Sequence, residues 1–246
     1  MDIHEYQAKD LLKRFGVNVP RGGIAYSPEQ AVYRARGLSG DKCVVKAQIH
    51  SGARGKAGGV RICGSDDEIS SAASWMLGRR LVTHQTGPQG KLVGRLYIEE
   101  AMDIAQEIYL AFVMDRTEER VVVVASAQGG MEIEEISANE PDSIIRSVVD
   151  PAVGMQNFQA REIAFQLGLD PSLINQAVKT ITGCYRLMEE LDASMVEVNP
   201  LVVTGAGEIV ALDAKVSFDD NALFRRPEIS ELRDKSQEDG RETYAE

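Results

Sequence analysis

The sequence predicts an α+β protein, because helical and strand-like segments are mixed without a regular βαβ alternation. Segments with apolar residues at helical spacing alternate with short apolar runs typical of strands. Near the C-terminus two such runs flank residues 204–208, which is hairpin spacing and predicts antiparallel strands. The chain has 246 residues, 43% of them apolar and 26% charged, enough for one large domain or two small ones with a sizeable core.

The first 80 residues are predicted to contain three helices and a strand. A helix over 3–15 is expected to have Asp2 as its N-cap. A second helix is expected to begin after Ser27, where serine is followed by proline in the first turn. Ser65 opens a third helix with a capping box. The apolar run 43–48 predicts a strand between the second and third helices.

The rest of the chain is predicted to be richer in strands. A long amphipathic helix is expected from Asp170 to about Glu190. Residues 225–246 are rich in charge and are expected to form a solvated helix or linker outside the core. The expected strands cover 94–99, 106–114, 120–126, 195–203 and 209–216.

Charge and composition exclude several classes of protein. The 27 basic and 38 acidic residues give a net charge of −11, which argues against general binding to nucleic-acid phosphates. No apolar run approaches the roughly 20 residues of a membrane span, and the acidic N-terminus lacks the apolar core of an export signal. Three scattered cysteines and only three histidines predict reduced thiols in a cytoplasmic protein without a histidine-rich metal site.

A basic, glycine-rich segment runs from Lys42 to Arg61 and contains no acidic residue. Glycines let backbone amides approach an anion, and lysine and arginine neutralise it. Lys46 interrupts an otherwise apolar strand, where an unpaired ammonium would be costly. The segment therefore predicts a phosphate-covering loop with Lys46 on a phosphate, although it matches neither the Walker A motif nor G-x-G-x-x-G. The alternative is an exposed basic turn, with Lys46 snorkelling from an edge strand.

The expected hairpin brings four polar side chains to one face. Strand alternation places Glu197 and Asn199 together, and a turn centred on residue 206 sets Asn199 across from Asp213 and Glu197 across from Lys215. Asp and Asn oxygens are hard ligands suited to Mg²⁺, which takes one or two protein ligands and phosphate oxygens. The alternative is a solvent-facing sheet with a cross-strand Glu–Lys pair.

Acidic residues at the end of one strand and in the next form a third candidate group. Glu99 and Glu100 precede a polar turn, and Glu107 follows it. Carboxylates at such positions can accept hydrogen bonds from an adenine amino group or from ribose hydroxyls. Plain surface acids are the alternative.

Several stretches of the chain resemble the β subunit of succinyl-CoA synthetase and the closely similar malate–CoA ligase β subunits. This group of acid–CoA ligases has an ATP-grasp nucleotide domain. The stretches that carry the resemblance are HEYQAK at 4–9, KRFG at 13–16, VVKAQIHSGARGKAGG at 44–59, LVTHQTGPQGK at 81–91, FQAREIAFQLGL at 158–169, MVEVNPLVV at 195–203 and LDAKVSFDDNALFR at 212–225. The stretch at 158–169 looks particularly like the malate enzyme.

The resemblance implies a role for each candidate residue. Lys46 would contact nucleotide phosphate, and Ala53, Arg54 and Gly55 would lie over the phosphates. Asn199 and Asp213 would hold Mg²⁺. The remaining candidates are Glu99, Met102 and Glu107 on the adenine and ribose side of ATP or ADP, and Glu197 facing the phosphorylated histidine of a partner α subunit. Glu197 and Arg54 are the expected catalytic residues.

The resemblance also implies the organisation of the chain. It predicts an ATP-grasp fold of two α/β subdomains with nucleotide bound between them, the smaller over about 20–100 and the larger over 1–19 plus about 104–227. Residues 228–246 would be a connector to a C-terminal CoA-ligase domain. Phosphate would pass from ATP to the α-subunit histidine, then to a dicarboxylic acid, and would then be exchanged for CoA. None of His4, His50 and His84 is the expected phosphate acceptor, and His50 is expected to support the loop.

Two other functions stay open at this point. One is an ATP-grasp ligase that works through an acyl phosphate without a phosphohistidine. The other is a nucleotide-binding assembly module without turnover. The retention of Lys46, Glu107, Asn199 and Asp213 favours an enzyme, since a sensor does not need magnesium ligands.

Overall fold

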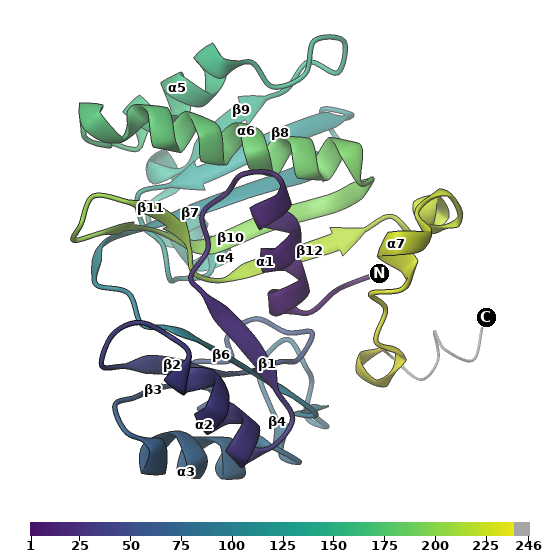
Figure 1. Ribbon diagram of the computed structural model, residues 1–246. Coiled ribbons are helices and arrows are strands. Elements are labelled where there is room, and N and C mark those ends of the chain that lie inside the picture. The colour runs from purple at the N-terminus through teal and green to yellow at the C-terminus, as the bar shows by residue number, and fades with distance from the viewer. Residues whose placement is uncertain (239–246) are drawn as a thin grey trace. The chain divides into compact units, whose positions relative to one another are not determined.

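A computed structural model describes residues 1–238, which form two compact units (Figure 1). Unit 1 consists of Met1–Val19 and Asp103–Leu232, and unit 2 consists of Pro20–Met102 and residues 233–238. Each unit has its own hydrophobic core. Within residues 1–238, none of the helices is both long and apolar enough to cross a lipid bilayer.

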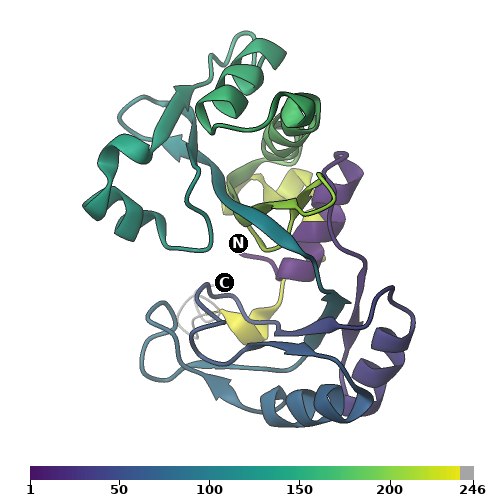
Figure 2. The same ribbon diagram turned by 90° about the vertical axis from the view of Figure 1, so that its left-hand side faces the viewer.

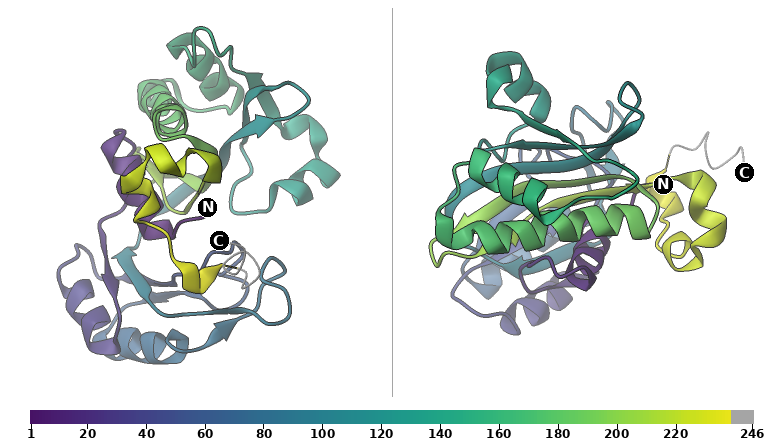
Figure 3. Two further views of the ribbon diagram at one scale, coloured as in Figure 1. Left: turned by 90° about the vertical axis from the view of Figure 1, so that its right-hand side faces the viewer. Right: turned by 90° about the horizontal axis from the view of Figure 1, so that it is seen from above.

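Unit 1 is built on one antiparallel sheet with the strand order β11-β10-β7-β8-β9, in which β12 also pairs with β10. Figure 3 shows the long helix α6 lying across this sheet. The strands are β7 (Ile104–Asp115), β8 (Arg120–Ser126), β9 (Ile145–Val148), β10 (Ala193–Thr204), β11 (Ile209–Ala211) and β12 (Ala214–Phe218). The helices are α1 (Glu5–Arg14), α4 (Ile133–Asn139), α5 (Asn157–Gln166), α6 (Ile174–Glu190) and α7 (Pro227–Ser230), with short 3₁₀ turns at Pro141–Ser143, Pro171–Leu173 and Asp220–Arg225.

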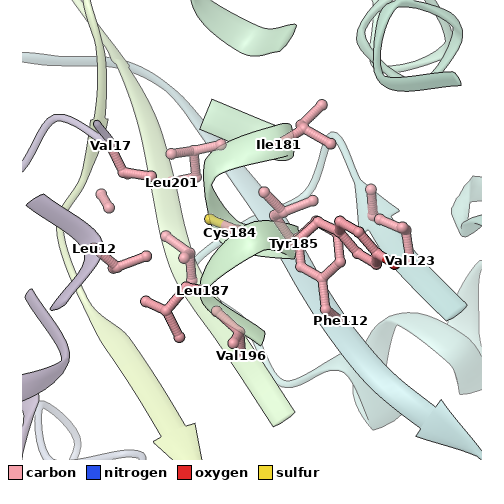
Figure 4. Packing of buried hydrophobic residues seen from close by; sticks show 14 of the residues in the cluster. Leu12, Val17, Phe112, Val123, Ile181, Cys184, Tyr185, Leu187, Val196 and Leu201 are labelled. Carbon is pink, nitrogen blue, oxygen red and sulfur yellow. The ribbon is translucent and has the colours of Figure 1, made fainter. Parts of the chain in front are cut away.

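The core of unit 1 fills the space between this sheet and its helices (Figure 4). Phe112 and Val196 point from the strands toward Ile181 and Leu187 of α6. Leu12 of α1 joins the same cluster. Because side chains alternate along a strand, the neighbours of these apolar residues in β7 and β10 face the opposite side of the sheet. That opposite side carries the polar residues of the candidate site.

Unit 2 has a smaller antiparallel sheet with the order β1-β6-β2-β3, and Figure 2 shows its two helices running along one side of it. The bounds are β1 (Gly22–Ala25), α2 (Pro28–Arg36), β2 (Cys43–Ala47), β3 (Val60–Cys63), α3 (Asp66–Met76), β6 (Leu96–Glu100) and a separate pair, β4 (Arg80–Leu81) with β5 (Lys91–Leu92). Val45 and Ile98 pack under the helices with Ala73 and Met76. Lys46 and Glu99 are the sequence neighbours of these two strand residues and lie on the other face.

The helix starts test the expected caps. Ser27 and Ser65 accept hydrogen bonds from the amides of Gln30 and Glu68, which confirms both caps. The expected Asp2 cap is wrong, because α1 begins at Glu5 and its N-cap is His4. The backbone amide of His4 donates to Gln7 Oε1 at 2.9 Å. Asp2 instead bridges to Ser217 and extends the sheet next to β12.

The charged C-terminal stretch is only partly solvated. Ile229 of α7 is 1% exposed in the core of unit 1, so the expectation that this stretch stays outside the core is wrong at that residue. In unit 2, the carboxylate of Asp234 pairs with Arg95 at 2.7 Å, and the buried Gln237 side chain donates to the Leu92 carbonyl at 3.0 Å. Residues 239–246 of the expected connector lie outside the described residues.

Candidate functional site

The candidate phosphate lysine, Lys46, forms a buried ion pair in unit 2. It lies on β2, which has β6 on one side and β3 on the other, so the interpretation of an edge-strand lysine is wrong. Its ammonium contacts the carboxylate of Glu99, and the two side chains are 8% and 1% exposed. An ammonium that is held beside one carboxylate and is already largely removed from water can also bind an anion, because little further desolvation is needed.

The glycine-rich loop between β2 and β3 is a compact turn. Ala53 and Gly58 adopt left-handed backbone conformations, with φ of 56° and 77°. The amides of Ala57 and Gly59 both donate to the carbonyl of Arg54, at 3.2 and 2.8 Å. The guanidinium of Arg54 points inward and donates to the carbonyl of Ala47 at 2.9 Å. The arginine expected over the phosphates thus ties the loop to its own strand.

A second loop of unit 2, residues 82–88, fastens the start of the glycine-rich loop. The buried hydroxyls of Ser51 and Thr83 lie 2.6 Å apart, and the Gly52 amide donates to Gln85 Oε1 at 2.7 Å. Between the two loops is a cavity of about 550 Å³ that Lys56 lines. The sequence offered no separate reason to select Thr83 and Gln85, because residues 81–91 were considered only as one of the stretches that resemble the ligase β subunits.

The second group of candidates meets on the hairpin of β10, β11 and β12 in unit 1. Glu197 is paired with Lys215, and the Asn199 amide donates to the Asp213 carbonyl at 3.0 Å, which confirms the expected register. The apolar neighbours Val196 and Val198 are buried under the helices. The polar side chains therefore lie on the open face, as alternation predicts.

Asn199 is held by a loop that the sequence did not associate with the hairpin. Its Oδ1 accepts from the Gly130 amide at 2.8 Å, and its Nδ2 donates to the Met131 carbonyl at 2.8 Å. A Cβ at Gly130 would lie 2.3 Å from Oε2 of Glu107, so this loop also approaches the candidate ribose carboxylate closely. The Gly129-Gly130 pair is the only sequence signal for this arrangement.

The surroundings of the Glu197 carboxylate shift its pKa. Burial raises its pKa above 4.5, Lys215 opposes that rise, and the carboxylates of Asp213 and Glu134 add to it. Tyr109 lies near the same group, because Glu197 and Glu134 also raise the pKa of its phenol, which burial raises most. Glu134, on α4, is therefore a further acid of this face that the sequence did not reveal.

These oxygens fit a magnesium ion that shares its coordination with phosphate. Among residues 1–238, no three His, Cys, Asp or Glu side chains come together in a way that would hold a metal ion. Asn199 and Asp213 would offer two oxygen ligands, and Oδ1 of Asn199 keeps a lone pair beyond its bond to Gly130. Mg²⁺ usually takes one or two protein oxygens and completes its shell with water and phosphate. The excess of carboxylates around Glu197 also favours a nearby cation.

The remaining candidates are placed separately. Glu107 belongs to β7, on the face opposite the helices, while Met102 follows β6 in unit 2. Gly55 has open space where a Cβ would stand.

The fold and these residues define the class of protein: the family of ATP-grasp domains matches residues 2–203, and the chain belongs to that family. Among curated relatives, a probable malate–CoA ligase subunit beta from Mesorhizobium japonicum is 71% identical over 245 residues. The succinate–CoA ligase [ADP-forming] subunit beta from Geobacillus thermodenitrificans is 53% identical over the same length. Both alignments cover 100% of this chain but only 62% and 64% of those subunits.

A solved structure supports the fold. The dinucleotide-forming acetyl-coenzyme A synthetase 1 of Ca. Korarchaeum cryptofilum, solved with coenzyme A, acetyl-coenzyme A and a phosphorylated phosphohistidine segment, superposes with a TM-score of 0.66 at 20% identity. The match covers 89% of this chain and 93% of that one.

Proposed function

We propose that this chain is the nucleotide-binding part of the β subunit of an ADP-forming dicarboxylate–CoA ligase. The observation that carries the proposal is the 71% identity to a malate–CoA ligase β subunit along the whole chain. The lower identity, 53%, to a succinate–CoA ligase β subunit favours malate as the acid. The cytoplasmic location expected from the scattered cysteines and the acidic N-terminus stays a prediction.

In unit 2, Lys46 and the loop with Ala53, Arg54 and Gly55 bind the nucleotide phosphates. The burial of Lys46 beside Glu99 supports this role, because a positive charge acts most strongly on an anion where water is excluded. Glu99 also orients the ammonium, and with Met102 it lines the adenine and ribose side.

In unit 1, Asn199 and Asp213 bind Mg²⁺, which neutralises charge on the phosphates when it is bound. The loop at Gly130 and Met131 fixes the orientation of the Asn199 side chain, so its oxygen is aimed without loss of side-chain freedom on binding.

Glu197 faces the histidine of an α subunit that accepts the phosphate. Its raised pKa suits a carboxylate that shares a proton with a histidine ring or accepts one from it. The phosphate then passes to the dicarboxylic acid, and CoA displaces it. Charge neutralisation by Lys46, Arg54 and Mg²⁺ provides most of the acceleration.

The test is acid-dependent release of ADP by the full-length β subunit with its α partner, comparing malate with succinate. The proposal expects turnover with a dicarboxylate and transfer of the γ-phosphate of ATP to an α-subunit histidine. Phosphate that appears on the acid without passing through a histidine would instead indicate an acyl-phosphate ligase.

A further inference from the structure

Two cysteines face each other at the end of the β2–β3 hairpin opposite the glycine-rich loop. Cys43 opens β2 and Cys63 closes β3, and they are directly paired in the antiparallel register. Both are free thiols, 4% and 3% exposed, and both belong to the apolar cluster under α2 and α3. Directly opposed residues project to the same face of a sheet, so the two sulfur atoms are neighbours.

The type of pairing determines how well a disulfide would fit. The Ala47 amide donates to the Gly59 carbonyl at 2.8 Å, and hydrogen-bonded pairs alternate along an antiparallel ladder. Cys43 and Cys63, four pairs away, are therefore a hydrogen-bonded pair, with Cα atoms about 5.5 Å apart. That separation lies within the range of disulfides, but their Cβ atoms must approach to about 3.5–4.5 Å, closer than such pairs normally stand.

A small cavity borders both cysteines. A cavity of about 130 Å³ is lined by Cys43 and Cys63 together with residues of the turns on either side, among them Lys42 and Gly64. A water molecule occupies about 30 Å³ of liquid, so a molecule the size of hydrogen peroxide fits. Burial raises the pKa of Cys43 to about 11 and also raises that of Cys63, so the resting pair is protonated and its oxidation, which needs a thiolate, becomes faster as pH rises.

We propose that Cys43 and Cys63 form a reversible disulfide under peroxide, a modification site at the end of the β2–β3 hairpin remote from the phosphate-covering loop. The thiolate form of Cys63, on the edge strand β3, attacks a peroxide oxygen: an S–O bond forms, the O–O bond breaks, and the released hydroxide takes up the proton that the thiol had lost and leaves as water. The sulfur of Cys43 then attacks the sulfenic sulfur, and the S–S bond forms as the S–O bond breaks. Hydroxide leaves with the second thiol proton as another water. In sum, two thiols are oxidised to a disulfide and one peroxide is reduced to two waters.

The strain of the cross-link makes it reversible and couples it to the loop. A disulfide that pulls its strands together has a higher reduction potential than a relaxed one, so thiols reduce it readily. Lys46 lies three residues along β2 from Cys43 and is opposite Val60 of β3. The approach of the two strands therefore also moves Lys46. Displacements of about 1 Å are enough to weaken a positioned contact. Provided that Lys46 binds phosphate as proposed above, the disulfide lowers nucleotide affinity.

The test is thiol mapping of the folded chain after graded hydrogen peroxide, by alkylation and peptide mass spectrometry. The expected product has Cys43 and Cys63 joined, Cys184 still alkylated, and both thiols restored by dithiothreitol. Cys184→Ser should behave as the parent, and Cys63→Ser should give no internal disulfide. Cys43 and Cys63 that stay separately alkylatable, or that oxidise to sulfinic acids without linking, would overturn the proposal.

A second measurement on the same samples separates this inference from the proposed function. Mg–ADP titrated into the oxidised chain should bind roughly tenfold more weakly than to the reduced chain, and dithiothreitol should restore binding. If the disulfide forms and affinity is unchanged, the coupling to the loop is wrong. If the reduced chain itself binds no Mg–ADP, the proposed function fails, whatever the thiol map shows.

Discussion

At the scale of the residue, the candidate site differs from the protein surface in the burial of its charged side chains. Lys46 and Glu99 are nearly inaccessible, whereas Arg36 and Asp66 form a pair of similar geometry on the surface, with the two side chains 69% and 49% exposed. Breaking a buried pair leaves one charge without compensation, while an exposed pair contributes little.

Lys46→Met is therefore expected to weaken Mg–ADP binding and to lower the free energy of unfolding by about 3–5 kcal/mol, because the buried Glu99 side chain loses its ion-pair partner. The double variant Lys46→Met/Glu99→Leu should recover much of the stability but none of the affinity. Urea unfolding and calorimetric titration measure the two effects, with Arg36→Met as the control. Nucleotide affinity retained by Lys46→Met would exclude the lysine from the phosphate site.

Asp213→Ala is expected to abolish the dependence of nucleotide affinity on Mg²⁺, because the hairpin loses one of its two proposed metal ligands. Glu208→Ala removes an exposed acid from the turn of the same hairpin and serves as the matched control. Titrations with ADP in the presence and absence of Mg²⁺ measure the dependence. An Asp213→Ala chain that binds Mg–ADP as tightly as the parent would reject the assignment.

The pKa of Glu197 makes stability depend on pH in a definite direction. Its folded pKa lies above the ordinary 4.5, chiefly because of burial, so the folded state holds its proton more tightly than the unfolded state. The contribution of this group to stability is present at low pH and is lost as pH rises from about 4.5 through the folded pKa. Thermal unfolding at a series of pH values should show Glu197→Gln gaining relative to the parent across that window. A constant difference between the two would contradict the raised pKa.

At the scale of the element, the two hairpins differ in what holds them. The β10–β12 hairpin is fixed by its register and by β7, which pairs with the other edge of β10. The loop between β2 and β3 is fastened at its start by Thr83 and Gln85, and within itself by the turn at Arg54.

Residues 53–58 are consequently expected to exchange amide hydrogens rapidly without nucleotide and to become protected when Mg–ADP is bound. Gln85→Ala should extend the rapid exchange to Gly52, because its amide loses its acceptor. Hydrogen exchange read by mass spectrometry, with the hairpin tip at 205–208 as internal reference, measures this. Equally strong protection in both states would identify a rigid structural turn.

Periodicity predicted those features of the elements that depend on neighbouring residues. Alternation alone placed Glu197 and Asn199 opposite Val196 and Val198, and serine caps marked the starts of α2 and α3. The Lys46–Glu99 pair was out of reach, because it depends on β6 pairing with β2 across about fifty residues of chain. Contacts of the 129–131 loop with Asn199 were missed for the same reason.

At the scale of the whole molecule, the mixture of helices with antiparallel strands and a resemblance spread along the chain predicted the ATP-grasp fold, and the family match confirms it. The strand order within each sheet could not be predicted, since many orders bury the same apolar faces. The resemblance supplied the roles of Met102 and Glu107, for which the local pattern carries little information.

The 246-residue chain is expected not to form acyl-CoA by itself, because the histidine that accepts phosphate is proposed to lie on an α subunit. Phosphoryl transfer needs its acceptor within about 3–3.5 Å of the reacting atom, so the missing acceptor removes turnover and does not merely slow it. A coenzyme A thioester assay with malate or succinate, with and without the α partner, measures this. Thioester formation by the chain alone would contradict the assignment of the acceptor.

The most direct measurement of the central claim is a thermal unfolding titration of this chain with Mg–ADP. A ligand that binds only the native state raises the unfolding temperature as its concentration rises, by about 2.7 kcal/mol of stability at a hundredfold excess over the dissociation constant. The account predicts such a rise with Mg–ADP, its reduction by EDTA, and its loss in Lys46→Met. An unfolding temperature that does not respond to Mg–ADP at any concentration would contradict it.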